Sequence, residues 1–139
     1  MTKPKVLVAR AIFPEVIDRL SEHFDITSNQ ADTVWTKTEL TEALRDKVGA
    51  FTTSSERIDA DVLAACPQLR IVANMAVGYN NFDIDAMTAR GVLATNAPDV
   101  LTETTADFGF ALLMATARRV TESERYLRAG QWTKWNYEM

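Results

Sequence analysis

The most promising stretch for chemistry is the turn that follows the apolar run Leu69–Val77. Gly78 ends this run abruptly, and polar turn-forming residues follow until a short helical pattern begins near Asp83. A glycine lets a ligand approach the main chain closely, and unpaired amides at a strand end form a concave site for anions. The N–H groups of Ala76–Gly78 could therefore bind an anion. A single glycine is a weak motif, and the alternative is that Gly78 only makes a turn.

Two other polar stretches offer hydroxyl groups. Thr52–Ser55 lies at the end of a predicted strand, where its hydroxyls could bind substrate oxygens, although a cap or turn role for Ser55 fits equally well. Thr102–Thr105 opens a long helical pattern whose free N–H groups favour a phosphate or carboxylate. Simple capping by Thr102 is the favoured explanation there.

The remaining reactive side chains point away from catalysis. His23 is the only histidine and ends the first predicted helix, which favours a surface role near the helix dipole. Cys66 is the only cysteine, so we expect structural packing and no metal site. Trp132, Trp135 and Tyr137 form an aromatic tail that suits an interface.

Composition narrows the possible partners. The 139 residues suit one domain, and a net charge of -4 gives no footprint for nucleic acid. No apolar run reaches the roughly 20 residues of a membrane span. The first residues lack the apolar segment of a signal peptide, so we expect a cytoplasmic protein.

Strand and helix patterns alternate along the chain, as they do in parallel α/β sheets. Strands are predicted over residues 5–10, 25–28, 48–53, 70–77 and 92–95. Helices are predicted over residues 13–24, 36–47, 59–66, 83–90 and 102–129. We therefore predict an α/β fold with a five-stranded parallel, doubly wound sheet, flavodoxin-like strand order and a long C-terminal helix.

Local signals mark several helix ends. Pro14 suits a first turn, and Thr36 with Glu39 forms a capping box. Gly91 and Gly130 are expected to terminate the helices that precede them.

Motifs for other chemistry are absent. The sequence contains no G-x-G-x-x-G, no P-loop and no G-x-S-x-G. A flavodoxin would need a hydroxyl- and glycine-rich phosphate loop where Arg10–Pro14 stands, and a response-regulator receiver would need an aspartate where Thr53-Ser54 ends the third strand.

Three stretches together resemble a known family. Ser55–Asp59, Leu69–Asn81 and Thr95–Asp107 are similar to the D-isomer-specific 2-hydroxyacid dehydrogenases, with the glyoxylate/hydroxypyruvate reductase branch as the nearest match. The likeness covers essentially the whole chain. It implies a substrate domain over residues 1–101, a crossover and dimerisation helix over 102–131 and an aromatic tail over 132–139, with the Rossmann NAD(P) domain outside this chain.

The resemblance also implies roles for individual residues. The amides of Val77 and Gly78 would hold the substrate carboxylate, Ser54 would line the substrate pocket, and Thr104 would lie near the nicotinamide. The family's catalytic arginine, its acidic partner and its histidine would all lie beyond Met139, so no catalytic residue is assigned here. This sequence departs from the family at Ser54, commonly leucine, and at Asn80, often aspartate.

The resemblance implies that this chain carries half of an active site. The intact family transfers a hydride between NAD(P)H and a small 2-keto or 2-hydroxy acid, whereas this chain alone is expected to be inactive and to bind no cofactor tightly. The alternative is a non-catalytic flavodoxin-like scaffold, or an excised domain, with no ligand of its own. We favour a long helix that folds back as the fifth helix over one that exchanges with a second copy to form a homodimer.

Overall fold

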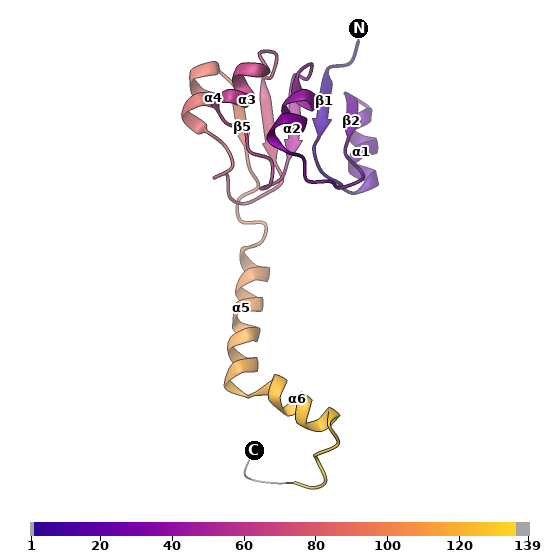
Figure 1. Ribbon diagram of the computed structural model, residues 1–139, viewed down its shortest axis with the longest axis vertical. Coiled ribbons are helices and arrows are strands. Elements are labelled where there is room, and N and C mark those ends of the chain that lie inside the picture. Colours follow the sequence, from indigo (N-terminus) through magenta and orange to yellow (C-terminus); the bar gives the residue numbers. More distant parts are fainter. Residues whose placement is uncertain (1, 136–139) are drawn as a thin grey trace. The chain divides into compact units, whose positions relative to one another are not determined.

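The computed structural model describes residues 2–135 as two compact units, the first ending at Asp99 and the second beginning at Val100. The strands of the first unit are β1 (Lys5–Val8), β2 (Asp25–Ser28), β3 (Gly49–Thr52), β4 (Ile71–Asn74) and β5 (Leu93–Thr95). Its helices are α1 (Pro14–Ser21), α2 (Lys37–Leu44), α3 (Ala60–Ala65) and α4 (Ile84–Arg90) (Figure 1).

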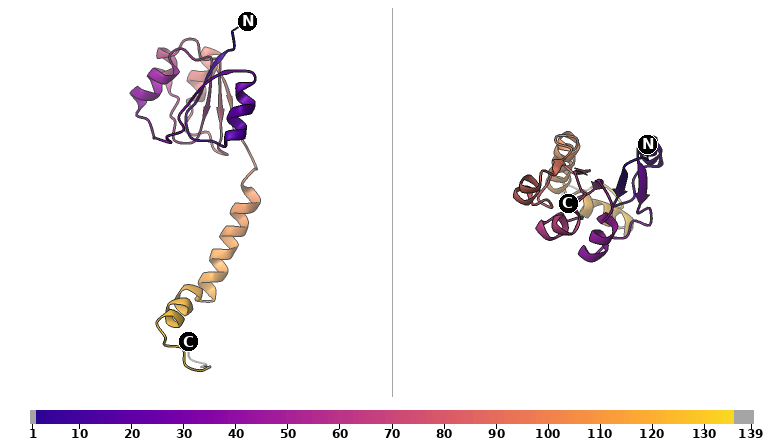
Figure 2. Two further views of the ribbon diagram at one scale, coloured as in Figure 1. Left: turned by 90° about the vertical axis from the view of Figure 1, so that its right-hand side faces the viewer. Right: turned by 90° about the horizontal axis from the view of Figure 1, so that it is seen from above.

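The five strands form one sheet in the order β2-β1-β3-β4-β5, and all neighbours are parallel. The predicted α/β class, the parallel sheet and the flavodoxin-like order are confirmed. Helix α1 lies on one face of the sheet, beside β2, and α2, α3 and α4 cover the other face (Figure 2). All strand carboxyl ends therefore share one edge, where ligands bind in folds of this kind.

The core lies between the sheet and helices α2, α3 and α4. Leu7, Ala50 and Val72 are neighbours in register on adjacent strands and are buried. They pack against the buried helix residues Leu40, Leu44, Val62, Leu63 and Met87. Burying each large apolar side chain contributes about 1.5–3 kcal/mol, so this layer holds the strand ends in place.

The other face of the sheet is only partly covered. Ile71 and Leu93 pair in register on β4 and β5, and these residues are 40% and 65% exposed. Helix α1 packs beside β2 at the opposite end of the sheet. An apolar surface over β4 and β5 is therefore open within the first unit.

Several predicted helix ends are confirmed. Thr36 and Glu39 form the complete capping box of α2, and Pro14 is the first residue of α1. Gly91 ends α4 with a φ of 66°, the left-handed conformation that glycine adopts without strain.

The predicted strand over residues 70–77 is too long. β4 ends at Asn74, although the N–H of Met75 still donates to the carbonyl of Thr52. Ala76 and Val77 belong to the following loop, so the apolar character of these residues overestimates the strand. Similarly, β1 ends at Val8 and not at residue 10.

The second unit corrects the prediction of one continuous helix. It contains α5 (Thr102–Ala117) and α6 (Val120–Arg128), because Arg119 adopts a left-handed φ of 52° and interrupts the helical hydrogen bonds. Thr102 is also not the N-cap: Leu101 takes that position and makes no side-chain cap bond.

The end of the second unit carries part of the aromatic tail. The rings of Trp132 and Trp135 pack edge to face with centroids 5.9 Å apart, whereas Tyr137 lies outside the described residues. Among residues 2–135, no helix is both long and apolar enough to cross a membrane.

Candidate functional site

The candidate site is the loop over residues 75–80, at the carboxyl end of β4. The carboxyl ends of the strands form the lower edge of the first unit in Figure 1. The loops that follow β3 and β5 lie on either side, because these strands flank β4 in the sheet.

Three consecutive carbonyl groups of this loop are held by the protein. The N–H of Ala97 donates to the Ala76 carbonyl at 3.0 Å. The side-chain amide of Asn96 donates to the Val77 carbonyl at 2.7 Å, and that of Asn74 donates to the Gly78 carbonyl at 3.0 Å. The loop after β5 and the last residue of β4 therefore set the orientation of this loop's backbone.

The N–H groups of the same loop are available. Within residues 2–135, the N–H groups of Val77 and Gly78 donate no hydrogen bond, and both residues are exposed. Because the neighbouring carbonyls are held by other groups, the two free N–H groups present a local positive potential that suits an anion.

Gly78 is not needed for the shape of this loop. Its φ lies outside the left-handed range that Gly91 and Gly130 adopt. A Cβ added to Gly78 would meet one atom, the Oδ1 of Asn80, at 3.4 Å. The absence of a side chain therefore leaves open space next to the backbone, which is what close approach by a ligand requires.

Two buried asparagines join this loop to the loop after β3. Asn74 and Asn81 share a hydrogen bond of 3.1 Å between their side-chain amides. The Asn81 amide also donates to the carbonyls of Thr53 at 3.1 Å and Glu56 at 2.9 Å. Thr52 donates its hydroxyl to Asn74 at 3.1 Å. Within the described residues, every buried side-chain nitrogen and oxygen has a partner, so this network rigidifies both loops.

The hydroxyl groups after β3 divide into two kinds. The Ser55 hydroxyl accepts from Arg10 Nη1 at 2.7 Å and donates to the buried Glu56 carboxylate at 2.8 Å. Ser54 is exposed, and in residues 2–135 its side chain makes no hydrogen bond. Ser55 thus serves the loop structure, whereas Ser54 is available for a ligand.

Arg10 extends the network to the loop after β2. Its Nε donates to Asp32 at 2.8 Å. This hydrogen bond, with a second from the Ala11 N–H, holds the pKa of Asp32 below its usual value. Arg10 thus connects three loops at the same edge of the sheet.

Sequence reasoning missed this network. Asn74, Asn81 and Asn96 were not singled out, nor were Arg10 and Glu56. A signal existed at Asn74, a polar residue between the apolar residues Ile71–Ala73 and Met75–Val77 that precede Gly78. A buried amide is costly unless it has partners, so its place in a strand indicates a structural network.

The other candidates stand apart from this loop in the first unit. His23 precedes β2, which places it at the amino edge of the sheet, and its side chain is 72% exposed. Cys66 is buried at the end of α3, and burial raises the pKa of its thiol, which agrees with a packing role. Across residues 2–135, no cluster of His, Cys, Asp or Glu is arranged to hold a metal ion.

Thr104 belongs to the second unit. It lies exposed in the first turn of α5, one residue after Glu103. Its role near a nicotinamide stays a prediction, as do the ligand roles of Ser54, Val77 and Gly78.

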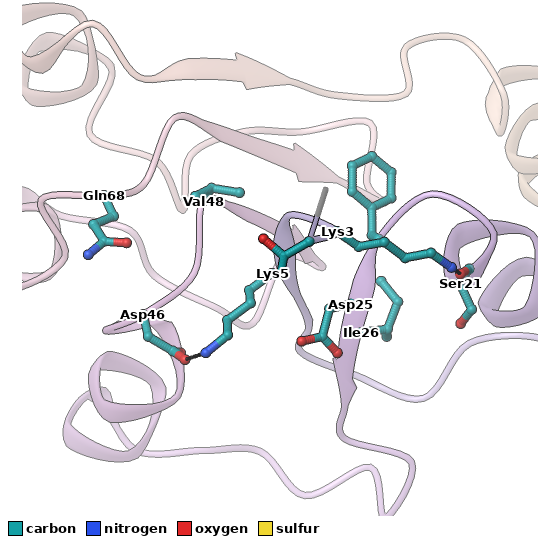
Figure 3. Close-up of a pocket in the computed structure, with 10 residues that line it drawn as sticks. Lys3, Lys5, Ser21, Asp25, Ile26, Asp46, Val48 and Gln68 are labelled. Atoms are coloured by element: carbon teal, nitrogen blue, oxygen red, sulfur yellow. Dashed lines mark hydrogen bonds and ion pairs between the residues drawn. The ribbon is translucent and has the colours of Figure 1, made fainter.

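A separate hollow of about 960 Å³ opens at the amino edge of the sheet (Figure 3). Its lysines have partners: Lys5 pairs with Asp46 at 2.8 Å, and Lys3 donates to the Ser21 carbonyl at 2.6 Å. Because ligands of parallel α/β sheets bind at the opposite, carboxyl edge, this hollow is not the candidate site.

Comparison with known proteins identifies the family. A sequence model of the D-isomer specific 2-hydroxyacid dehydrogenase catalytic domain matches residues 6–130. The chain belongs to this family.

Among curated relatives, glyoxylate reductase of Thermococcus kodakarensis is 46% identical over 132 residues. Glyoxylate/hydroxypyruvate reductase B of Klebsiella pneumoniae is 41% identical over 132 residues. Each match covers 95% of this chain, but only 40% and 41% of the respective relative. The chain therefore spans about two fifths of the length of these enzymes.

Solved structures agree with the fold. A Thermus thermophilus protein superposes with a TM-score of 0.84 at 37% identity, covering 97% of this chain and 43% of that one. The NADPH-dependent glyoxylate/hydroxypyruvate reductase of Sinorhizobium meliloti, solved with NADP and malonate, gives a TM-score of 0.74 at 36% identity. That match covers 94% of this chain and 40% of the other.

Proposed function

We propose that this chain provides the substrate-carboxylate site of an NAD(P)H-dependent 2-hydroxyacid dehydrogenase that reduces glyoxylate or hydroxypyruvate. The observation that carries the proposal is the loop after β4, in which the Val77 and Gly78 amides are free while the neighbouring carbonyls are held. The names of the relatives support the choice of a small 2-keto acid.

The chain's own part in the reaction is binding and orientation. Two amides that donate to one carboxylate neutralise part of its charge and fix its plane. Fixing the carboxylate also fixes the adjacent keto carbon, which must face the nicotinamide for hydride transfer. NAD(P)H supplies the hydride when bound. Ser54 would contact the rest of the substrate, and Thr104 would lie near the nicotinamide.

We expect the purified 139-residue chain to bind glyoxylate weakly and to catalyse no turnover. The sequence contains no G-x-G-x-x-G for the dinucleotide, and its only histidine, His23, lies at the wrong edge of the sheet. Oxidation of NADPH in the presence of glyoxylate or hydroxypyruvate is the direct assay. Turnover well above the rate without protein would refute the expectation of inactivity.

The competing function is a scaffold without a ligand. It predicts no saturable binding of glyoxylate, whereas the carboxylate site predicts saturable binding that a second small carboxylate, such as malonate, displaces. Calorimetric or NMR titration of the same preparation separates the two. Absence of binding at concentrations of glyoxylate that leave the fold intact would favour the scaffold.

The arrangement of the long helical segment is a further proposal. Phe108 and Leu112 on α5 are 65% and 53% exposed, and apolar side chains of this size need cover in solution. Folding back as a fifth helix predicts a monomer in light scattering, whereas exchange with a second copy predicts a homodimer.

A cytoplasmic location also stays a prediction, which cell fractionation tests.

A further inference from the structure

We propose that Asn96 is a positioning residue, which aims the Gly78 N–H group at the substrate carboxylate by holding the carbonyl of Val77. The inference rests on the proposed function of this loop. It assigns to the loop after β5 a role in binding that neither the fold nor the family match specifies.

The peptide group between Val77 and Gly78 links the two atoms concerned. The Val77 carbonyl and the Gly78 N–H belong to the same planar unit, and in a trans peptide they point in opposite directions. The described residues contain no cis peptide bond. The Asn96 amide donates to the Val77 carbonyl at 2.7 Å. This hydrogen bond therefore turns the carbonyl towards β5 and the Gly78 N–H away from it.

The neighbouring peptide groups are fixed in other ways. The backbone N–H of Ala97 holds the Ala76 carbonyl, which orients the Val77 N–H without any side chain. Asn74 holds the Gly78 carbonyl, which orients the N–H of Tyr79. Within residues 2–135, Asn96 is the one side chain that acts on the peptide between Val77 and Gly78.

Asn96 is also separate from the buried network that stabilises the loops. It follows the last residue of β5 and is half-buried. In the part of the chain that the structure describes, its side chain makes this one hydrogen bond. Asn74 and Asn81 keep their own partners when Asn96 is shortened. Substitution of Asn96 should therefore affect the peptide orientation far more than the stability of the sheet.

The expected effect on binding is moderate. Without Asn96, the peptide between Val77 and Gly78 samples other orientations, and binding must select the productive one. The loss in binding free energy is about that of one hydrogen bond between neutral groups. It corresponds to about tenfold weaker affinity for glyoxylate.

The test compares Asn96→Ala with Thr95→Ala in the purified chain. Thr95 is the adjacent exposed residue, and within residues 2–135 its side chain makes no hydrogen bond, so its removal is the matched control. Glyoxylate is titrated into both variants and the unsubstituted chain, and amide shifts are followed by NMR. We expect about tenfold weaker binding for Asn96→Ala, no change for Thr95→Ala, and similar melting temperatures. Equal affinities in all three proteins would overturn the proposal.

A second measurement works without a ligand. Residual dipolar couplings report the direction of each N–H bond, so Asn96→Ala should change the coupling of Gly78 and leave those of β3 and β4 unchanged. An unchanged Gly78 coupling would refute the positioning role even if binding weakens.

If the unsubstituted chain does not bind glyoxylate, the proposed function fails, and the coupling alone decides the role of Asn96. Should Asn96→Ala not fold, Asn96→Asp removes the donor at nearly constant volume and is read by the same coupling.

Discussion

Replacing Asn81 by alanine should loosen the whole carboxyl edge of the sheet. The substitution removes the donor to the Glu56 carbonyl, which is buried, and the donor to the Thr53 carbonyl, which is partly buried. Neither carbonyl has another donor among residues 2–135. A buried polar group that loses its partner costs about 1–3 kcal/mol. With one fully and one partly buried carbonyl, we expect a loss of roughly 3 kcal/mol in the free energy of unfolding.

Native-state hydrogen exchange of core amides in β1 and β4 measures this loss. Their exchange proceeds through global opening, so a loss of about 3 kcal/mol accelerates it on the order of 100-fold. Asn80→Ala is the control, because that side chain is exposed and should change stability by less than about 0.5 kcal/mol. A loss below about 1 kcal/mol for Asn81→Ala would refute the view that the amide network holds the two loops.

Two further predictions concern single residues of the first unit. Gly78→Ala should melt like the unsubstituted chain, because the φ of Gly78 is not left-handed. Gly91→Ala places a side chain at a φ of 66° and should lower the free energy of unfolding by about 1–2 kcal/mol. Equal losses of stability in thermal melts of the two variants would contradict this difference. Hydrogen bonds from Lys47 and then Lys5 lower the pKa of Asp46 from 3.8 to about 2. Its carboxylate therefore stabilises the fold above the unfolded pKa, and this contribution is lost as the pH falls through the folded pKa. Asp46→Asn should flatten the loss of stability between pH 3.8 and about 2 in urea titrations, and an unchanged pH dependence would count against the ion pairs.

The architecture could be predicted because its signals are local or periodic. Alternation of short β-branched runs with helical spacing gives a parallel sheet, and the capping box at Thr36 and the glycine at Gly91 mark helix ends within a few residues. The position of the loops at one edge follows from the parallel strands alone. The predicted strand boundary was wrong where apolar residues continue into a loop, as at Ala76 and Val77.

The polar network could not be predicted because its partners are distant in sequence. The hydrogen bond from Asn96 to the Val77 carbonyl spans 19 residues, and the hydrogen bond from Asn81 to the Thr53 carbonyl spans 28. Neither contact leaves a periodic pattern. The break between α5 and α6 is similar, since Arg119 adopts a left-handed conformation without a glycine or proline to announce it.

The central claim is that the Val77 and Gly78 amides bind a carboxylate. The most direct measurement follows the ¹⁵N-labelled chain by NMR as glyoxylate is added, with glycolaldehyde as the uncharged control that lacks the carboxylate. The account predicts saturable shifts that are largest at Val77 and Gly78 with glyoxylate, and none there with glycolaldehyde. Shifts centred elsewhere, or equal shifts with both compounds, would contradict it.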